Sequence, residues 1–248
     1  ITKIGLDHQQ LLGSSLAAIA EEKAGIIKNG VPVALDATND ALVLEVVRKV
    51  AKHNNSQLYE VGKEPTPVRF QSPLQGEYQK QNLSLALKVL DLIQAKYPIT
   101  ESIQQEGISK TQWPGRLQTV VVRGRTVLLD GAHNESAAIE LGKYLQRTTT
   151  PKRIFVISMT NGKDVNGLLK YIVLPEDTVI ATSFTQPQNM PWVNPMDSTE
   201  LAEVAKNYAK DVYIDARPIG DVIELLDDSK SVVVCGSLYL CADVLRSG

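Results

Sequence analysis

Residues 1–28 read ITKIGLDHQQLLGSSLAAIAEEKAGIIK, and the spacing of apolar side chains in this stretch indicates the fold class. An apolar run over residues 1–6 stops at Asp7-His8, which is typical of a buried strand that delivers polar groups at its carboxyl end. From residue 16 to residue 27 apolar side chains recur at helical spacing, and two serines precede them as candidate caps. A strand that leads directly into a helix predicts an α/β fold.

Lys23 lies within this helical pattern, four residues after Ile19 and four before Ile27, so we expect its ammonium group to point inward. A buried charge is unfavourable unless it is paired, neutralised or chemically changed. The residues alone leave two interpretations of Lys23 open: a side chain that reaches water or a neighbouring glutamate, and a functional group. His8 is open in the same way, as an ordinary core histidine or as a ligand.

Composition and charge exclude several classes of partner. The 248 residues are 43% hydrophobic and 22% charged, an ordinary globular composition that is sufficient for two domains. A formal charge of −2 and a pI of about 6.0 give no basic field, so we expect no nucleic acid and no membrane surface as partner. The sequence has neither a membrane-spanning apolar run nor a leader pattern, and its two cysteines do not form a disulfide framework. These features favour a soluble cytosolic protein with reduced, partly buried thiols.

Beyond residue 30, short apolar runs alternate with helical patterns, which predicts a parallel sheet covered by helices. The expected strands are 31–35, 57–61, 117–122, 126–129, 154–158, 178–182, 212–214 and 232–235; the expected helices are 78–96, 100–110, 136–146, 165–172, 199–209, 219–226 and 238–245, with a further helix capped by Asn39. A Pro-Gly break at 113–117 is the expected linker between domains at 1–112 and 118–248. The second domain is Rossmann-like in layout, but without GxGxxG we do not expect it to bind a dinucleotide.

The string IGLDHxxxLGxxxxxIAxEKAGIxK, which starts at Ile4, resembles the signature of dihydrofolate synthase and folylpolyglutamate synthase. These are ATP-dependent amide ligases related to the Mur ligases. The resemblance implies that residues 1–112 are part of a Mur-ligase-type ATPase domain and that residues 118–248 form a Rossmann-like C-terminal ligase domain. It also implies that His8 is a magnesium ligand and that Lys23 carries a carbamate. Carbamylation converts a buried cation into an anion with oxygen donors, the type of ligand that Mg²⁺ prefers.

Two further segments resemble nucleotide-binding parts of the same family. QKQNLSLA resembles the segment in which an asparagine contacts adenine, and Asn82 is the matching residue; an amide both donates to and accepts from the adenine edge. WPGR resembles the PGR segment between the domains, which implies that Arg116 reaches nucleotide phosphate with its permanently charged donor fork. The alternatives are an exposed helical asparagine and a hinge arginine in a surface ion pair.

The remaining candidates follow expected strands. DGAHN resembles the family's D-x-AHNP, which implies that Asp130 and His133 contact nucleotide or glutamate, although Glu135 replaces the usual proline. The family's KD pair and the serine of its CGS turn match Asp164 and Ser237, which are candidate contacts to glutamate. From local structure alone, each of the latter two residues is expected to cap a helix.

The resemblance implies that L-glutamate is joined to dihydropteroate or folate with ATP and Mg²⁺ as cofactors. ATP phosphorylates the acceptor carboxylate, and the glutamate amine attacks the acyl phosphate while Mg²⁺ and Arg116 neutralise charge. An enzyme of the Mur branch is the nearest rival. We expect a cytoplasmic location, with a mitochondrial pool as the alternative.

The Gly-rich P-loop that opens such ligases is absent from these 248 residues. The nearest string, Asn161-Gly162-Lys163, lacks the flanking glycines and the following Ser or Thr, so we expect a turn there. The resemblance therefore covers only the later part of a ligase, and we expect an N-terminal P-loop segment as its partner and no turnover by this chain alone. The alternative function is a non-catalytic fragment or relative that only binds nucleotide.

Overall fold

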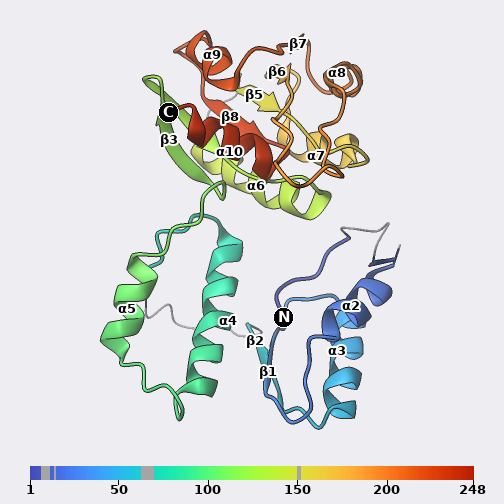
Figure 1. Cartoon of the computed structure of the whole chain (residues 1–248), viewed down its shortest axis with the longest axis vertical. Helices are drawn as coiled ribbons and strands as arrows, with labels where there is room; N and C mark the ends of the chain where they lie inside the picture. Colours follow the sequence, from blue (N-terminus) through green and yellow to red (C-terminus); the bar gives the residue numbers. More distant parts are fainter. Residues whose placement is uncertain (7–11, 14, 63–69, 150–151) are drawn as a thin grey trace. The chain divides into compact units, whose positions relative to one another are not determined.

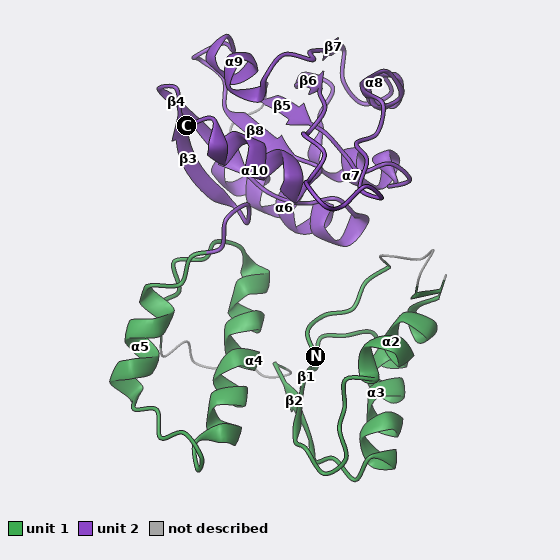
Figure 2. Ribbon diagram, viewed as in Figure 1, with its two compact units in different colours: residues 1–112 green, residues 113–248 purple. Residues whose placement is uncertain are grey.

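A computed structural model describes residues 1–6, 12–13, 15–62, 70–149 and 152–248 of the chain. The chain forms a mixed α/β fold, as the alternating pattern predicted (Figure 1). It divides into two compact units, Ile1–Gln112 and Trp113–Gly248 (Figure 2). The segment expected as a linker is counted with the second unit, in which Gly115 and Leu117 are buried.

The first unit contains a parallel pair of strands, β1 (Val33–Asp36) and β2 (Leu58–Val61). Helices α2 (Leu16–Ala24) and α3 (Ala41–His53) pack against each other and supply most of an apolar core that also includes β1. Ser15 caps α2, because its side chain accepts from the backbone N–H of Ala18 at 3.2 Å.

Asp40, and not Asn39 as predicted, caps α3, since its carboxylate accepts from the Leu42 N–H at 2.9 Å. Asn39 is buried and holds the chain start instead. Its Oδ1 accepts from the Ile4 N–H at 2.7 Å, and its Nδ2 donates to the carbonyl oxygen of Asp36 at 2.8 Å. The Asn39 side chain makes these buried tertiary hydrogen bonds and is therefore not available to cap α3.

Two further helices are present among the described residues of the first unit. α4 (Glu77–Ile93) contacts both β1 and β2 and buries Leu85, whereas α5 (Glu101–Ser109) buries no residue. Thr100 caps α5 as predicted, because its hydroxyl accepts from the Ile103 N–H at 3.3 Å. None of the helices in the described part of the chain is long and apolar enough to cross a membrane.

The second unit is built on a six-stranded sheet in the order β3-β4-β8-β5-β6-β7. The strands are β3 (Gln118–Val122), β4 (Arg125–Leu129), β5 (Ile154–Ile157), β6 (Thr178–Ala181), β7 (Asp211–Ile214) and β8 (Val232–Cys235). β3 and β4 form the predicted antiparallel hairpin, whose turn residues Arg123 and Gly124 both have positive φ (47° and 83°), a geometry that suits a two-residue hairpin. The other pairings are parallel, so the carboxyl ends of β4, β8 and β5 lie next to one another.

Helices connect the parallel strands of the second unit. They are α6 (Glu135–Thr148), α7 (Val165–Ile172), α8 (Ser198–Ala205), α9 (Ile219–Glu224) and α10 (Leu238–Arg246). α9 and α10 contribute apolar residues to one core cluster together with β3, β4, β5 and β8, and α6 packs along α7. The central strands β5, β6 and β8 are buried along their whole length, as expected for parallel strands covered by helices.

Candidate functional site

Polar groups converge at the carboxyl edge of β4 and β8 in the second unit. The backbone N–H of Asp130, just past β4, donates to the carbonyl oxygen of Val234, and that of Gly236, just past β8, donates to the carbonyl oxygen of Ala132. Helices α6 and α10 both begin at this edge, and their N-terminal ends carry partial positive charge. The edge therefore suits a negatively charged ligand.

Asp130 organises the segment that precedes β3. It is buried, and its Oδ2 and Oδ1 accept from the N–H groups of Leu117 and Ala132, each at 2.9 Å. Burial raises the pKa of the Asp130 carboxyl, while these two backbone hydrogen bonds and the charges of Arg116 and His133 oppose the rise. Both oxygens thus have donors within the protein, so Asp130 fixes the backbone beside Arg116, and its contact to a ligand stays a prediction.

Arg116 lies close to Gly131, in the loop that follows β4. A Cβ added to Gly131 would lie 3.2 Å from Arg116 Nη1 and 2.3 Å from Leu238 Cδ2. Any side chain at residue 131 would therefore displace its neighbours. The second unit brings together Arg116 and Asp130, two residues that sequence reasoning selected separately.

His133 follows in the same loop and is half-buried. Its Nδ1 lies 2.8 Å from the carbonyl oxygen of Gly131. Because a carbonyl only accepts, Nδ1 carries the proton in this hydrogen bond, which fixes the orientation of the imidazole ring.

Ser237 and Asp164, the two candidate contacts to glutamate, differ in whether they cap a helix. Ser237 is buried and caps α10 as expected, since its Oγ accepts from the Tyr239 N–H at 3.1 Å. Asp164 occupies the position before α7 but makes no side-chain capping bond, so the capping expectation is wrong for it. Its carboxylate instead lies over Gly167, where a Cβ would be 2.5 Å from Asp164 Oδ2.

Sequence reasoning did not select Ser158, which follows β5. Its hydroxyl is the one buried side-chain polar atom without a hydrogen-bond partner among the described residues. Gly236 lies against it: a Cβ there would be 2.5 Å from the Ser158 carbonyl oxygen, and Gly236 has φ +98°. The only signal in the sequence is a polar residue at the end of an apolar run.

In the first unit, the side chain of Lys23 is exposed, so the prediction that it points inward is wrong. The buried residues of α2 are Ile19, Ala20 and Ala24, and the helix ends at Ala24. Ile27 therefore lies beyond the helix and does not extend the apolar stripe past Lys23, whose long side chain reaches solvent. His8, the other implied magnesium ligand, lies outside the described residues.

Asn82 lies on α4, half-buried, and its Nδ2 donates to Gln79 Oε1 at 2.9 Å. Its neighbour Gln81 was not singled out from the sequence. Gln81 Nε2 donates to Asp36 Oδ1 at 3.0 Å and to the carbonyl oxygen of Val61 at 2.7 Å, which ties α4 to the carboxyl ends of both β1 and β2. Asn82 is thus held near a strand edge of the kind at which ligands bind in α/β sheets.

No group of three or more His, Cys, Asp or Glu side chains that could hold a metal ion is present in the described part of the chain.

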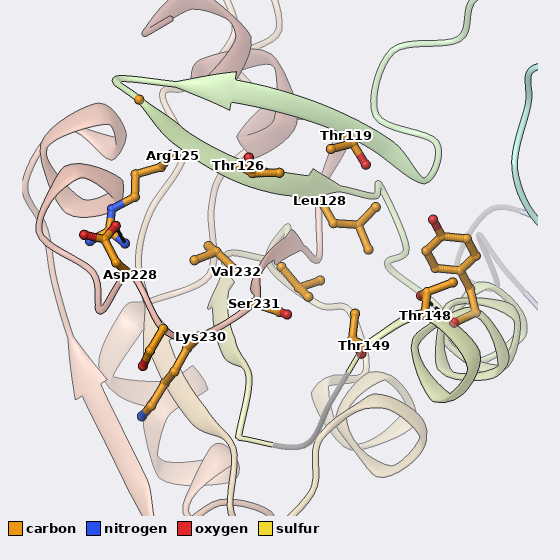
Figure 3. A pocket seen from close by; sticks show the side chains of 14 residues that line it. Thr119, Arg125, Thr126, Leu128, Thr148, Thr149, Asp228, Lys230, Ser231 and Val232 are labelled. Atoms are coloured by element: carbon orange, nitrogen blue, oxygen red, sulfur yellow. Dashed lines mark hydrogen bonds and ion pairs between the residues drawn. The ribbon is translucent and has the colours of Figure 1, made fainter.

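The string at residues 161–163 is a turn, as predicted, with Gly162 at φ +81°. A cavity of about 530 Å³ in the second unit lies at the amino ends of β4 and β8 and is lined by none of the predicted site residues (Figure 3).

The fold and the site define the second unit as an α/β domain that presents an arginine, a histidine and two helix N-termini at the carboxyl edge of its sheet. Residues 115–247 match the family model described as dihydrofolate synthetase, C-terminal domain. The chain belongs to the dihydrofolate synthetase family.

Individual relatives agree with this assignment. A probable dihydrofolate synthetase of Schizosaccharomyces pombe is 36% identical over 99% of this chain and 64% of the relative. A crystal structure of folylpolyglutamate synthase from Thermotoga maritima superposes with a TM-score of 0.72 at 26% identity, over 94% of this chain and 57% of that one. A bifunctional folylpolyglutamate synthase/dihydrofolate synthase from Yersinia pestis, complexed with AMPPNP and a Mn ion, shares the fold with a TM-score of 0.75 at 22% identity, over 98% of this chain and 59% of that one. The chain thus spans 57–64% of the length of these relatives.

Proposed function

We propose that this chain is the later part of an ATP-dependent ligase that joins L-glutamate to dihydropteroate or folate through an acyl phosphate. The observation that carries the proposal is the meeting of Arg116, His133 and Ser237 with two helix N-termini at one sheet edge, within the segment that matches the family model. Such an edge suits reactants that carry carboxylate and phosphate groups.

The residues of the second unit have distinct roles in this proposal. Arg116 binds a phosphate oxygen through its donor fork and neutralises charge as the acyl phosphate forms. The N-terminus of α10, with Ser237, and the oriented ring of His133 bind the carboxylates of glutamate, and Asp164 lies near its amine. Asp130 acts indirectly, because it holds the backbone around Arg116 in place.

The first unit binds the nucleotide and the metal in this proposal. Asn82 contacts adenine, and His8 with a carbamylated Lys23 would hold Mg²⁺, which would neutralise charge on the phosphates. Since Lys23 is exposed, burial gives no reason for a carbamate, and this part of the proposal rests on the match to the family signature. The Yersinia pestis relative, which was crystallised with AMPPNP and Mn, supports a nucleotide site with a divalent cation.

The test is ATP-dependent incorporation of labelled glutamate into dihydropteroate by this chain joined to the N-terminal third of its S. pombe relative. We expect turnover that Arg116→Ala lowers by at least about a hundredfold, in line with the loss of a charge-stabilising donor. Lys206→Ala is the matched control, because Lys206, the exposed residue that follows α8, forms an ion pair with Glu203. Absence of glutamate incorporation, or full turnover by Arg116→Ala, would contradict the proposal.

A further inference from the structure

The chemistry of asparagine side chains draws attention to a turn that the proposed ligase site does not use. An asparagine that is followed by glycine is especially prone to spontaneous deamidation, because glycine has no side chain to shield its backbone nitrogen. The sequence has three such pairs, which begin at Asn29, Asn161 and Asn166. All three asparagines are exposed, so exposure does not separate them, and the hydrogen bonds around each pair decide its reactivity.

The reaction requires that two groups are free. The backbone nitrogen of the glycine gives up its proton and attacks the side-chain amide carbon of the asparagine. A new C–N bond forms, and ammonia leaves with that proton. Water then opens the cyclic imide to give aspartate or isoaspartate. A hydrogen bond to the glycine N–H or to the asparagine amide must be broken before the attack, so it slows the reaction.

Both groups are free at Asn161. Among the described residues, no hydrogen bond holds the side chain of Asn161 or the N–H of Gly162. The pair forms the tip of a turn, which the Lys163 N–H closes on the carbonyl oxygen of Thr160 at 3.2 Å. Gly162 has φ +81°, as in a type II turn. Because both residues of the pair are exposed, water reaches the imide.

The other two pairs are held by hydrogen bonds. The N–H of Gly30 donates to the carbonyl oxygen of Asn54 at 2.9 Å, so the attacking nitrogen beside Asn29 is engaged. Asn166 lies in the first turn of α7, and its Oδ1 accepts from the Tyr208 hydroxyl at 3.0 Å. The helical backbone also fixes φ and ψ there, which hinders closure of the ring.

The reactive turn lies at the sheet edge where we place the ligase site. It follows β5, which pairs with β8, and α10 begins shortly after β8. The base of the turn is fixed, because Thr160 forms a bridge with Pro195 and the Asn161 N–H donates to the carbonyl oxygen of Asn194 at 2.9 Å. Deamidation therefore adds a carboxylate at a defined place, close in sequence to Asp164. The isoaspartate product also lengthens the main chain at this point.

We propose that Asn161 is a modification site, which deamidates spontaneously in the folded protein, and that the new carboxylate weakens the binding of glutamate. The first part depends only on the geometry of the turn. The second part rests on the proposed function, in which a substrate with two carboxylates binds at the same edge and is repelled by added negative charge.

Peptide mapping by mass spectrometry tests the first part on the 248-residue chain after incubation in mildly alkaline buffer. Trypsin places the three Asn-Gly pairs in separate peptides. We expect Asn161 to deamidate at least about tenfold faster than Asn29 and Asn166, because no hydrogen bond has to be broken first. The chain unfolded in guanidinium chloride is the matched control, in which the three pairs should react at comparable rates.

Three results of the mapping would overturn the modification site. They are no deamidation of Asn161 in the folded chain, a rate at Asn29 or Asn166 that equals the rate at Asn161, and the same preference for Asn161 in the unfolded chain. The last result would show that the neighbouring sequence, and not the fold, sets the rates.

The second part is tested with this chain joined to the N-terminal third of its S. pombe relative. We expect Asn161→Asp, which reproduces one product, to raise the KM for glutamate several-fold and to leave the KM for ATP unchanged. Asn161→Ser is the neutral control and should leave both values near those of the wild type. A wild-type KM for glutamate in Asn161→Asp would overturn the second part. The mapping needs no ligase activity, so the modification site and the proposed function can fail separately.

Discussion

Asp130 is the residue on which the geometry of the candidate site depends. It is buried next to Arg116, and its two oxygens accept from backbone N–H groups on both sides of the loop. We predict that Asp130→Asn lowers the free energy of unfolding by about 1–3 kcal/mol, because an amide has only one acceptor oxygen and leaves a buried N–H unsatisfied. Urea denaturation of the two proteins measures the difference.

The same substitution has a predicted pH dependence. Burial raises the pKa of Asp130 in the folded protein above its ordinary value of 3.8, so folding favours the protonated form. The stability that this group contributes is fully present below that ordinary value and is lost as the pH rises through the raised pKa. The stability difference between wild type and Asp130→Asn should therefore be largest near pH 4 and shrink as the pH rises. A difference that grows with pH would show that the hydrogen bonds and Arg116 outweigh burial.

The two cysteines are predicted to be unreactive in the folded protein. Burial raises the pKa of the Cys241 thiol to about 12 and that of Cys235 well above its ordinary value. Since only the thiolate reacts, a thiol reagent at pH 8 should label neither residue until the chain is unfolded, and then both. Mass spectrometry with and without denaturant counts the labels, and rapid labelling of the native chain would contradict the burial.

At the scale of the elements, a buried ion pair joins the amino ends of β5 and β6. Arg153 and Asp177 are buried, and Asp177 accepts from the guanidinium, from the Arg153 N–H and from the Leu174 N–H. We predict that Asp177→Ala destabilises the second unit by about 3–5 kcal/mol, because it leaves the guanidinium buried without its partner. Thermal unfolding measures the loss. Asp211→Ala on the edge strand β7 is the control, since Asp211 is exposed, and an equal effect of both substitutions would refute the argument.

Local sequence signals predicted most elements, and their limits are clear from particular residues. Ser15, Thr100 and Ser237 cap helices as expected, because a cap depends on residues within one helical turn. Asn39 and Lys23 did not behave as predicted. Asn39 accepts a hydrogen bond from Ile4, thirty-five positions away, and Lys23 lies where its helix ends. Such tertiary demands leave no periodic signal in the sequence.

The same limit applies to the candidate site. Motif resemblance selected Arg116, Asp130 and His133, but no local pattern predicted that β8 inserts between β4 and β5. This insertion brings the loops of separate strands to one edge. Pairing between strands distant in the sequence depends on side chains from many segments. The link from Gln81 to Asp36 was missed for that reason.

At the scale of the whole molecule, the second unit is predicted to fold without the first. It has its own six-stranded sheet and core, and the family model covers almost all of it. Residues 113–248 expressed alone should therefore unfold cooperatively. The first unit should not, because its described residues form a sheet of two strands and leave α5 unburied. Urea denaturation of each unit followed by circular dichroism compares them, and a molten second unit would contradict the prediction.

The last prediction concerns catalysis by these 248 residues on their own. The sequence contains no Gly-rich P-loop, and phosphoryl transfer depends almost wholly on positioning and on stabilisation of charge around the phosphates. Without the backbone N–H groups and the lysine of such a loop, Arg116 alone does not hold a triphosphate in a reactive position. We expect neither ATP hydrolysis nor glutamate incorporation above background by the purified chain with Mg²⁺ and bicarbonate, and recovery of both when the N-terminal third of the S. pombe relative is joined to it. Robust turnover by the chain alone would show that its own residues suffice to position the nucleotide.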